Sequence, residues 1–580
     1  MCAANTQISD GMKMEWDVPI EMDDGLVLRA DVFRPVSEGC FPVILSYGPY
    51  GKGLAFQDGY KTAWDIMARD YPDAVAGSSN KYANWETVDP EKWVPDGYAC
   101  VRVDSRGAGR SPGFLCHNNA RETRDIYLCI EWAAAQPWSS GKVGMNGISY
   151  YASNQWRAAA AQPPHLAAIC VWEGWCDSYR DGNRHGGIIC AFRKNWQEMQ
   201  VKTVQHGVGD RGARSRVTGD TVCGPETLEE AELAKNREDM WSELLSRPLD
   251  GAYYRERTAD LSKVTVPLLS AANWGGQGLH TRGNFEGFMG AASRHKWLEV
   301  HGGSHWAPFY TDYGVKLQKR FFDHFLKGAD NGWDRQPRVQ LQVRHPGERF
   351  LLRHENEWPI ARTKWTRFYL DPRGMRLTTE PLAEEGSIAY DAMSEGVGFS
   401  TPPLERETEI IGPSALKLFI SSSTADADIF AVLRIFDARD KEVLFQGALD
   451  PKTPVGQGWL RVSQRKLDPG RSLPYRPFHT HDEKQPLTPG DVLEIDVEIW
   501  PTCIVVPAGY RIALSIRGRD YEHDGAAATL SNMKNPMRGC GPFVHDDPVD
   551  RPPEIFGGKL TLHFGAQRRS SVLLPIVPPK

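Results

Sequence analysis

Six short apolar runs, several of them separated by helical sequence, constrain the fold of this chain more than any other feature. The runs are FPVILSYGP (41–49), YACVRVDSRG (98–107), KVGMNGIS (142–149), LAAICVWEG (166–174), PLLSAANW (267–274) and KWLEVHGG (296–303). Runs of this length are typical of strands buried on both faces of a sheet. Helical patterns at 122–137 and 312–328 accompany them. The region 1–335 therefore predicts an α/β domain with a largely parallel sheet.

Two insertions interrupt this pattern. Residues 54–96 form a polar, aromatic-containing connection, and residues about 175–262 hold Arg- and Glu-rich helical sequence far from either flanking strand. Connections of this length are usually functional, as lids or caps. The second insertion is predicted to be a helical cap over a site.

The last third of the chain has a different period. From 336 to 580, short runs such as ALKLFISSS, DIFAVLRIFD and DVLEIDVEIWP alternate apolar and polar residues, and Gly, Pro and Asp lie between them. This pattern predicts an all-β sandwich of the jelly-roll type.

Composition narrows the possible partners. The 580 residues carry a net charge of −6, with 41% hydrophobic and 24% charged residues, which indicates neither a nucleic-acid nor a membrane partner. No signal peptide or apolar span of about 20 residues occurs, so we expect a cytoplasmic protein. The 11 cysteines contain no CxxC pair, and neither a metal site nor a dinucleotide fingerprint is found, so no cofactor is expected.

The stretch GKVGMNGISYYASNQW (141–156) predicts a sharp turn from a strand into a helix at Ser149. Such a nucleophile elbow needs a tiny residue two positions before the serine, and Gly147 meets that need. The common pattern has a second glycine where this chain has Tyr151. A serine that simply caps the helix is the alternative. Farther on, His305 follows the last apolar run, where a catalytic histidine is expected in the chain order Ser, acid, His.

The sequence resembles the family of serine hydrolases that includes cocaine esterase, Xaa-Pro dipeptidyl-peptidase and α-amino acid ester hydrolase. The resemblance rests on YGPYGKG (47–53), VRVDSRGAGRSPG (101–113), QPWSSGKVGMNGISYYASNQW (136–156) and VHGGSHW (300–306), and it continues through the β-rich part. It implies that Ser149 is the nucleophile and His305 the general base. It also implies an oxyanion hole made by the Tyr50 hydroxyl and the backbone N–H of Tyr150.

The catalytic acid does not follow from the resemblance. The family places an Asp two residues after a Trp, but here the residue two positions after Trp274 is Gly276, and Gln277 follows it. We expect the acid at the end of the preceding strand, with Glu173 preferred over Asp177. A dyad without an acid, or a loss of hydrolysis, stays open; in the serine proteases, losing the acid's function costs about 10⁴-fold in turnover.

The prediction is therefore a cofactor-independent hydrolase of a small-molecule ester or amide, which forms an acyl-enzyme on Ser149. Trp172, Trp175 and Asp177 are candidate substrate-binding residues near the cap. Two alternatives stay open: an acyltransferase that uses the same acyl-enzyme, and a non-catalytic binding protein with a degraded triad. The sequence leaves a homo-oligomer open.

Overall fold

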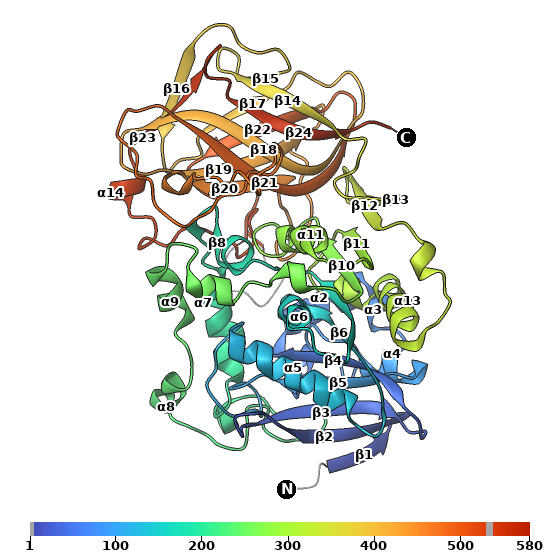
Figure 1. Ribbon diagram of the computed structural model, residues 1–580. Coiled ribbons are helices and arrows are strands. Elements are labelled where there is room, and N and C mark those ends of the chain that lie inside the picture. The colour runs from blue at the N-terminus through green and yellow to red at the C-terminus, as the bar shows by residue number, and fades with distance from the viewer. Residues whose placement is uncertain (1–4, 529–536, 580) are drawn as a thin grey trace.

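A computed structural model describes residues 5–528 and 537–579. It contains two large sheets, one in each half of the chain (Figure 1). In spatial order, the first sheet holds β1 (Asn5–Ser9), β2 (Met12–Glu21), β3 (Val27–Pro35), β5 (Ala99–Asp104), β4 (Phe41–Gly48), β6 (Ser139–Ile148), β7 (Leu166–Trp172), β10 (Leu268–Asn273), β11 (Lys296–His301), β12 (Val339–His345) and β13 (Arg349–Glu355).

The centre of the first sheet is parallel, as the apolar runs predict. The strands from β5 through β12 pair in parallel, and the sheet ends in antiparallel strands on both sides. All six predicted runs form strands of this parallel part. Because successive side chains of a strand point to opposite faces, each buried strand supplies two separate cores. In β4, for example, Val43 and Leu45 pack on one face and Ile44 packs on the other.

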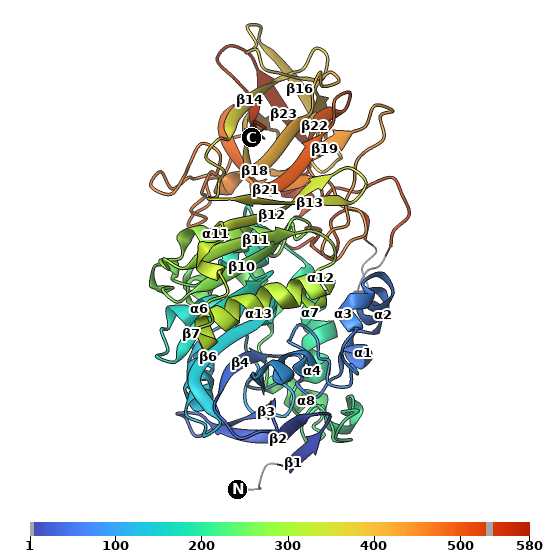
Figure 2. The ribbon, with the colours of Figure 1, turned by 90° about the vertical axis from the view of Figure 1, so that its right-hand side faces the viewer.

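Helices cover both faces of this sheet. Three of them, α5 (Ala120–Ala134), α6 (Tyr150–Ala160) and α11 (Thr281–Gly290), pack on one face, and α13 (Asp312–Lys327) packs on the other. In α13 the apolar positions Phe321, Phe322 and Leu326 are buried, and Gly328 ends the helix in the left-handed conformation. Figure 2 shows α13 lying across the sheet.

The first insertion is largely helical, and the second combines short helices with turns and loops. Residues 54–96 contain α1 (Phe56–Gly59), α2 (Lys61–Asp70), α3 (Pro72–Val75) and α4 (Pro90–Trp93). The predicted cap contains a π-helical turn (Ser178–Asn183), the hairpin β8 (Arg184–His185) and β9 (Ile188–Ile189), and helices α7 (Phe192–Trp196), α8 (Glu230–Lys235), α9 (Met240–Ser246) and α10 (Ala252–Glu256). The turn of that hairpin reaches the second half of the chain, since the Arg461 N–H donates to the Gly186 carbonyl at 2.7 Å.

The C-terminal domain is β-rich. In spatial order its sheet holds β16 (Gly386–Asp391), β23 (Lys559–Phe564), β18 (Thr408–Ser422), β21 (Leu493–Val506), β20 (Gly456–Arg461), β19 (Asp428–Phe436), β22 (Arg511–Arg517), β17 (Val397–Ser400), β15 (Arg376–Thr378), β14 (Lys364–Asp371) and β24 (Ser571–Val577). The sheet also closes on itself, because β18 pairs with β24. Its alternating strands enclose one apolar core.

The first sheet continues past residue 336, at which the sequence predicted the C-terminal domain to begin. β12 and β13 extend the first sheet, and the next strand of the second sheet begins at Lys364. Figure 2 shows β12 and β13 at the edge of the first sheet that faces the C-terminal domain. Arg344 in β12 is buried there and donates to the Cys503 carbonyl at 2.7 Å. Within the described residues, no helix is both long and apolar enough to cross a membrane.

Candidate active site

Ser149 occupies a strained turn between β6 and α6. Its backbone lies at φ 58° and ψ −109°, which non-glycine residues rarely adopt. At Gly147, a Cβ atom would lie 2.5 Å from the Tyr151 Cβ and 3.0 Å from the Glu86 carbonyl oxygen, so a larger residue would force the turn apart. Ser149 itself is partly exposed between two buried neighbours. Ser149 is therefore more exposed than the residues on either side of it in the turn.

The Ser149 hydroxyl contacts His280, a residue that the sequence prediction did not select. The distance between Ser149 Oγ and His280 Nε2 is 3.2 Å. His280 immediately precedes α11, in the loop GGQGLH that follows β10, and its backbone N–H donates to the Gly276 carbonyl at 3.1 Å. In the same loop Gly278 has φ 90° and lies against Phe543 of the C-terminal domain. The C-terminal domain thus helps to hold the loop that presents His280.

His305 lies beside His280 but contacts two carboxylates. Its Nδ1 lies 2.8 Å from Glu173 Oε2, and its Nε2 lies 3.0 Å from Glu86 Oε1. The rings of His280 and His305 are parallel, with centroids 5.0 Å apart. Among the hydrogen bonds of the described residues, none joins His305 to Ser149. The resemblance implied that His305 is the base, yet the imidazole nitrogen near Ser149 belongs to His280.

Glu173 directly follows β7 and has a left-handed backbone conformation, with φ 52°. Besides the His305 contact through Oε2, its Oε1 lies 3.1 Å from His301 Nε2 and 3.2 Å from Asn273 Nδ2. Its own carbonyl oxygen accepts the Ser149 N–H at 3.1 Å, which ties this strand end to the serine turn. The carboxylate that the sequence preferred as the acid is therefore fully buried and held by three side chains.

The charges of this cluster follow from its contacts. Burial alone would raise the pKa of Glu173, but the neighbouring His305 and His301 lower it to about 2. Burial disfavours the charged form of His305, yet Glu173 and Glu86 raise its pKa to about 10. Burial raises the pKa of Glu86 to about 7 despite the His305 contact. At neutral pH, His305 is therefore an imidazolium beside an ionised Glu173.

His280 has the opposite protonation state. Burial lowers its pKa well below the ordinary value, and the positive charge of His305 lowers it further. Arg193 acts in the same direction, whereas Glu173 opposes it. The imidazole beside the Ser149 hydroxyl is consequently neutral.

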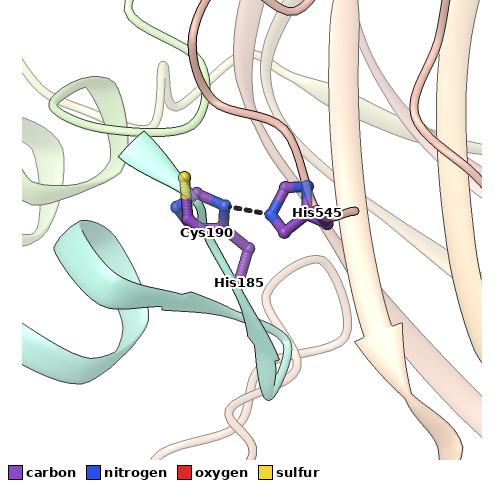
Figure 3. Close-up of side chains that lie close together, drawn as sticks. All are labelled: His185, Cys190 and His545. Atoms are coloured by element: carbon purple, nitrogen blue, oxygen red, sulfur yellow. Dashed lines mark hydrogen bonds between the residues drawn. The ribbon is translucent and has the colours of Figure 1, made fainter. Parts of the chain in front are cut away.

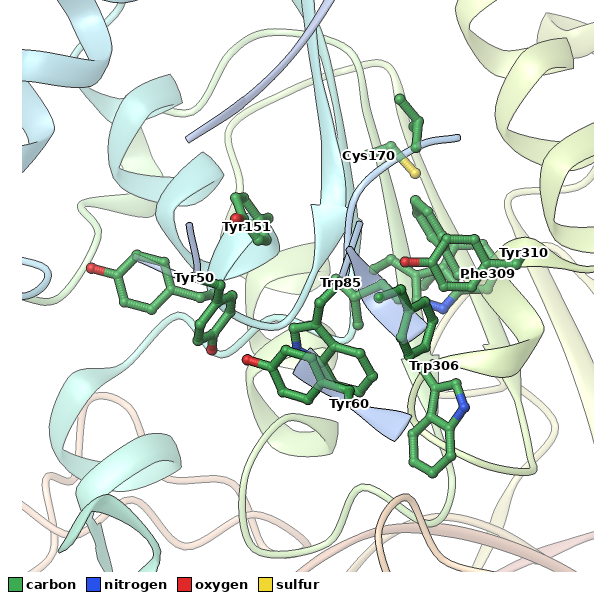
Figure 4. Close-up of a cluster of buried hydrophobic side chains, with 14 of the residues drawn as sticks. Tyr50, Tyr60, Trp85, Tyr151, Cys170, Trp306, Phe309 and Tyr310 are labelled. Atoms are coloured by element: carbon green, nitrogen blue, oxygen red, sulfur yellow. The ribbon is translucent and has the colours of Figure 1, made fainter. Parts of the chain in front are cut away.

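The two tyrosines predicted for the oxyanion hole lie beside the serine turn. The Tyr50 hydroxyl accepts a hydrogen bond from Trp196 Nε1 at 3.0 Å, and the Tyr50 ring packs edge-on against Tyr150 and Tyr151. Figure 4 shows Tyr50 next to Tyr151 in a buried aromatic cluster. Tyr150 is the first residue of α6, so its backbone N–H has no acceptor within the helix. Its hydroxyl donates to the buried Glu122.

The three candidate substrate-binding residues are all engaged with other side chains. Trp172 is fully buried and stacks on His301 at 4.9 Å. The guanidinium groups of Arg157 and Arg193 each lie 5.6 Å from the Trp175 ring. Asp177 caps the π-helical turn and forms an ion pair with Arg180 at 2.9 Å. Trp172 thus lies in the core, whereas Trp175 and Asp177 lie at the base of the cap.

Sequence reasoning missed His280, Glu86 and His301. The position of His280 in the sequence could have indicated it, because His280 follows the strand end at which the family's acid is absent. Glu86 gave no such signal, since it lies in the first insertion, 63 positions before Ser149 in the sequence. Its left-handed backbone, with φ 62°, is visible only in the structure.

Two buried groups of three side chains could in principle hold a metal ion: Glu173, His280 and His305 in this site, and His185, Cys190 and His545 between the cap and the C-terminal domain. In the first group the two imidazole rings are parallel and do not converge on one point. In the second, His185 Nδ1 lies 2.7 Å from His545 Nε2 (Figure 3). The outer ring nitrogens contact the Asp181 carbonyl and Asp520, so a chain of hydrogen bonds satisfies both imidazoles.

The cluster around Glu173 should make stability depend on pH in both directions. Glu173 titrates near 4.5 when unfolded and near 2 when folded, so its contribution is lost as pH falls toward 2. His305 titrates near 6.5 when unfolded and near 10 when folded, so its contribution is lost as pH rises through 10.

We therefore expect the destabilisation caused by Glu173→Gln to be largest between pH 4.5 and pH 6.5. Breaking a buried pair of this kind costs about 3–5 kcal/mol. Melting temperatures of the wild type and the variant, measured from pH 3 to pH 10, check this expectation. A difference that does not change with pH would contradict the assigned charges.

The strained serine, the neutral imidazole at its hydroxyl and the buried carboxylate–imidazole pair, all at the carboxyl edge of a parallel sheet, define a serine hydrolase. Comparisons with known proteins agree. The family model described as X-Pro dipeptidyl-peptidase (S15 family) matches residues 24–307, and the model of the X-Pro dipeptidyl-peptidase C-terminal non-catalytic domain matches residues 331–572. The chain belongs to this S15 family.

Individual relatives span nearly the whole chain. The crystal structure of a CocE/NonD family hydrolase from Staphylococcus aureus is similar with a TM-score of 0.85 and 30% identity, covering 100% of this chain and 97% of that one. Cocaine esterase from Rhodococcus sp. is 23% identical over 97% of this chain and 98% of its own length. The structure of an α-amino acid ester hydrolase, at 15% identity and a TM-score of 0.67, covers 98% of each chain and shows the shared fold.

Proposed function

We propose that Ser149 attacks the carbonyl carbon of a small-molecule ester or amide, and that its proton passes to the histidine pair His280 and His305. Water then hydrolyses the acyl-enzyme. This proposal rests on one observation: Ser149 lies on a strained turn, and its Oγ is 3.2 Å from an imidazole nitrogen of His280. A serine that merely capped α6 would accept a hydrogen bond from the helix, and the Ser149 side chain forms no such cap.

We propose Glu173 as the acid of the site. The 2.8 Å contact with His305 Nδ1 supports this role, because a triad carboxylate fixes the imidazole and stabilises its positive charge. Asp177 has less support, since it is already paired with Arg180.

We propose that the Tyr50 hydroxyl and the Tyr150 N–H bind the oxyanion. Tyr50→Phe should then lower kcat by about 10²–10³-fold with a smaller change in KM, since the hydrogen bond strengthens in the transition state. The hydrolysis rate of a p-nitrophenyl ester measures this effect. Tyr60→Phe is a matched control from the same aromatic cluster, and an equal loss in both variants would contradict the assignment.

The class of substrate is proposed from the site and from what the relatives are named for. Their names include cocaine esterase, Xaa-Pro dipeptidyl-peptidase and α-amino acid ester hydrolase, all of which cleave a carbonyl bond to oxygen or nitrogen. Trp175 and Asp177, at the base of the cap, are the proposed substrate-binding residues, and Trp172 supports them from the core. An acyltransferase would form the same acyl-enzyme, so product analysis with an added amine or alcohol separates the two activities.

Three further predictions stay proposals. A jelly-roll topology of the C-terminal domain is supported by its long antiparallel strands around one core. A cytoplasmic location is supported by ten free cysteines among the described residues, since thiols stay reduced there. Formation of a homo-oligomer is tested by measuring the molecular mass of the protein in solution.

Trapping of the intermediate tests the proposed function. Acid quenching during turnover of p-nitrophenyl acetate should give a protein mass increased by one acetyl group, located on Ser149 by peptide mapping. Turnover without an acyl-enzyme would contradict the proposal.

A further inference from the structure

We infer that His280 is the residue that removes the proton from Ser149, and that His305 is a positioning residue that stays bound between Glu173 and Glu86. This inference rests on the proposed function and refines it. The resemblance to the serine hydrolase family, by contrast, implies that His305 is the base.

The contacts distinguish the two histidines. Nε2 of His280 lies 3.2 Å from Ser149 Oγ, within reach for proton transfer. Both ring nitrogens of His305 are already bonded to carboxylates, at 2.8 Å and 3.0 Å. To accept the serine proton, His305 would first have to give up its hydrogen bond to Glu86.

The backbone around His280 is built to hold this position. Its N–H is bonded to Gly276, and its carbonyl accepts the Asn284 N–H at 3.1 Å as α11 begins. The Gly275 carbonyl accepts the Ala448 N–H at 2.9 Å, and the Ala448 carbonyl accepts the His305 N–H at 2.9 Å. One loop residue of the C-terminal domain, Ala448, therefore connects the loops of both histidines.

Charge balance explains why two carboxylates lie here. When Ser149 attacks, the bond between Oγ and the carbonyl carbon forms, the carbonyl π pair moves to the oxygen, and the proton moves from Oγ to His280 Nε2. The site then holds two imidazoliums, on His280 and His305, and two carboxylates, Glu173 and Glu86. The two carboxylates, with Glu86 ionised, offset the two imidazoliums, so the second imidazolium can form in a buried site. The proton moves within the site, so its net charge does not change, and the remaining negative charge is that of the oxyanion, which the proposed oxyanion hole binds. Collapse of the intermediate returns the proton to the leaving alcohol or amine.

The protonation states agree with this division of roles. A base must be unprotonated at the working pH. The pKa of His280 is lowered by burial and by the charges of His305 and Arg193, whereas Glu173 raises it. The pKa of His305 is raised to about 10 by Glu173 and Glu86 against the effect of burial. If His280 is the base, the acylation rate of the wild type should rise with pH below 6.5, where His280 loses its proton. It should show no rise near pH 10, where His305 loses its proton.

The test measures the acylation rate constant with p-nitrophenyl acetate as a function of pH in the wild type, His280→Gln and His305→Gln. We expect His280→Gln to lose about 10²–10⁴-fold and to lose the rise below pH 6.5. We expect His305→Gln to lose activity as well, because it breaks the same buried pair as Glu173→Gln, but to keep the rise below pH 6.5, since His280 still titrates there. His206→Gln, in the cap, is a control for replacing a largely buried histidine, and near-UV circular dichroism shows that each variant is folded.

The opposite pattern would overturn the inference: His280→Gln within about threefold of the wild type, with His305→Gln inactive and a wild-type rise near pH 10. Glu86 titrates near 7 and could add its own step; Glu86→Gln should therefore retain the rise below pH 6.5. If the wild type forms no acyl-enzyme at all, the proposed function itself fails. Acylation that is unaffected by His280→Gln overturns only the role of His280.

Discussion

Ser149→Ala lowers turnover on the order of 10⁶-fold, because it removes the only atom that can form the acyl-enzyme in the proposed mechanism. What remains is the binding and oxyanion stabilisation that do not need the hydroxyl. The variant should fold normally, since the Ser149 side chain caps no helix and is partly exposed. Steady-state hydrolysis of a p-nitrophenyl ester measures the loss.

Ser153→Ala is the matched control for this variant. Ser153 lies one turn farther along α6 and is buried. It should retain activity near that of the wild type. Ser149→Ala activity within about tenfold of the wild type would contradict a nucleophilic role.

Glu173→Gln lowers turnover about 10⁴-fold, the loss seen when a triad loses its carboxylate. The substitution keeps the size of the side chain but removes the charge that stabilises His305 and His301. Activity is measured above pH 6.5, outside the range in which the substitution is expected to destabilise the protein most. Melting temperatures measured in parallel separate lost chemistry from lost stability.

Glu299→Gln is the matched control for Glu173→Gln. Glu299 also contacts His301, at 2.8 Å, but in the described structure it forms no hydrogen bond to His305. It should lower stability without a comparable loss of turnover. Equal losses in the two variants would indicate that the cluster acts only through stability, and an active Glu173→Gln would remove Glu173 from the mechanism.

The sequence predicted the sheet and the serine turn because both depend on local patterns. Apolar runs bounded by turn residues form the six central strands, and Gly147 and Ser149 stand in the spacing that an elbow requires. Gly328 ends α13 for the same kind of local reason. Such features need only a few neighbouring residues, so they can be predicted without knowledge of the tertiary fold.

The partners of these residues could not be predicted in the same way. Glu86, Glu173, His280 and His305 come from four segments that meet only after the sheet has formed, and no local pattern specifies that His280 reaches Ser149. Likewise, β12 resembles the alternating strands of the C-terminal domain, yet it pairs in parallel with β11. Alternation records which faces are buried and not which sheet a strand joins.

Covalent labelling of the native protein with a fluorophosphonate probe tests the central claim most directly. The site predicts one label per chain, located on Ser149 by intact mass and peptide mapping, and no label in Ser149→Ala. A folded wild-type protein that takes up no label, or that carries it on another residue, would contradict the assignment of Ser149 as the nucleophile.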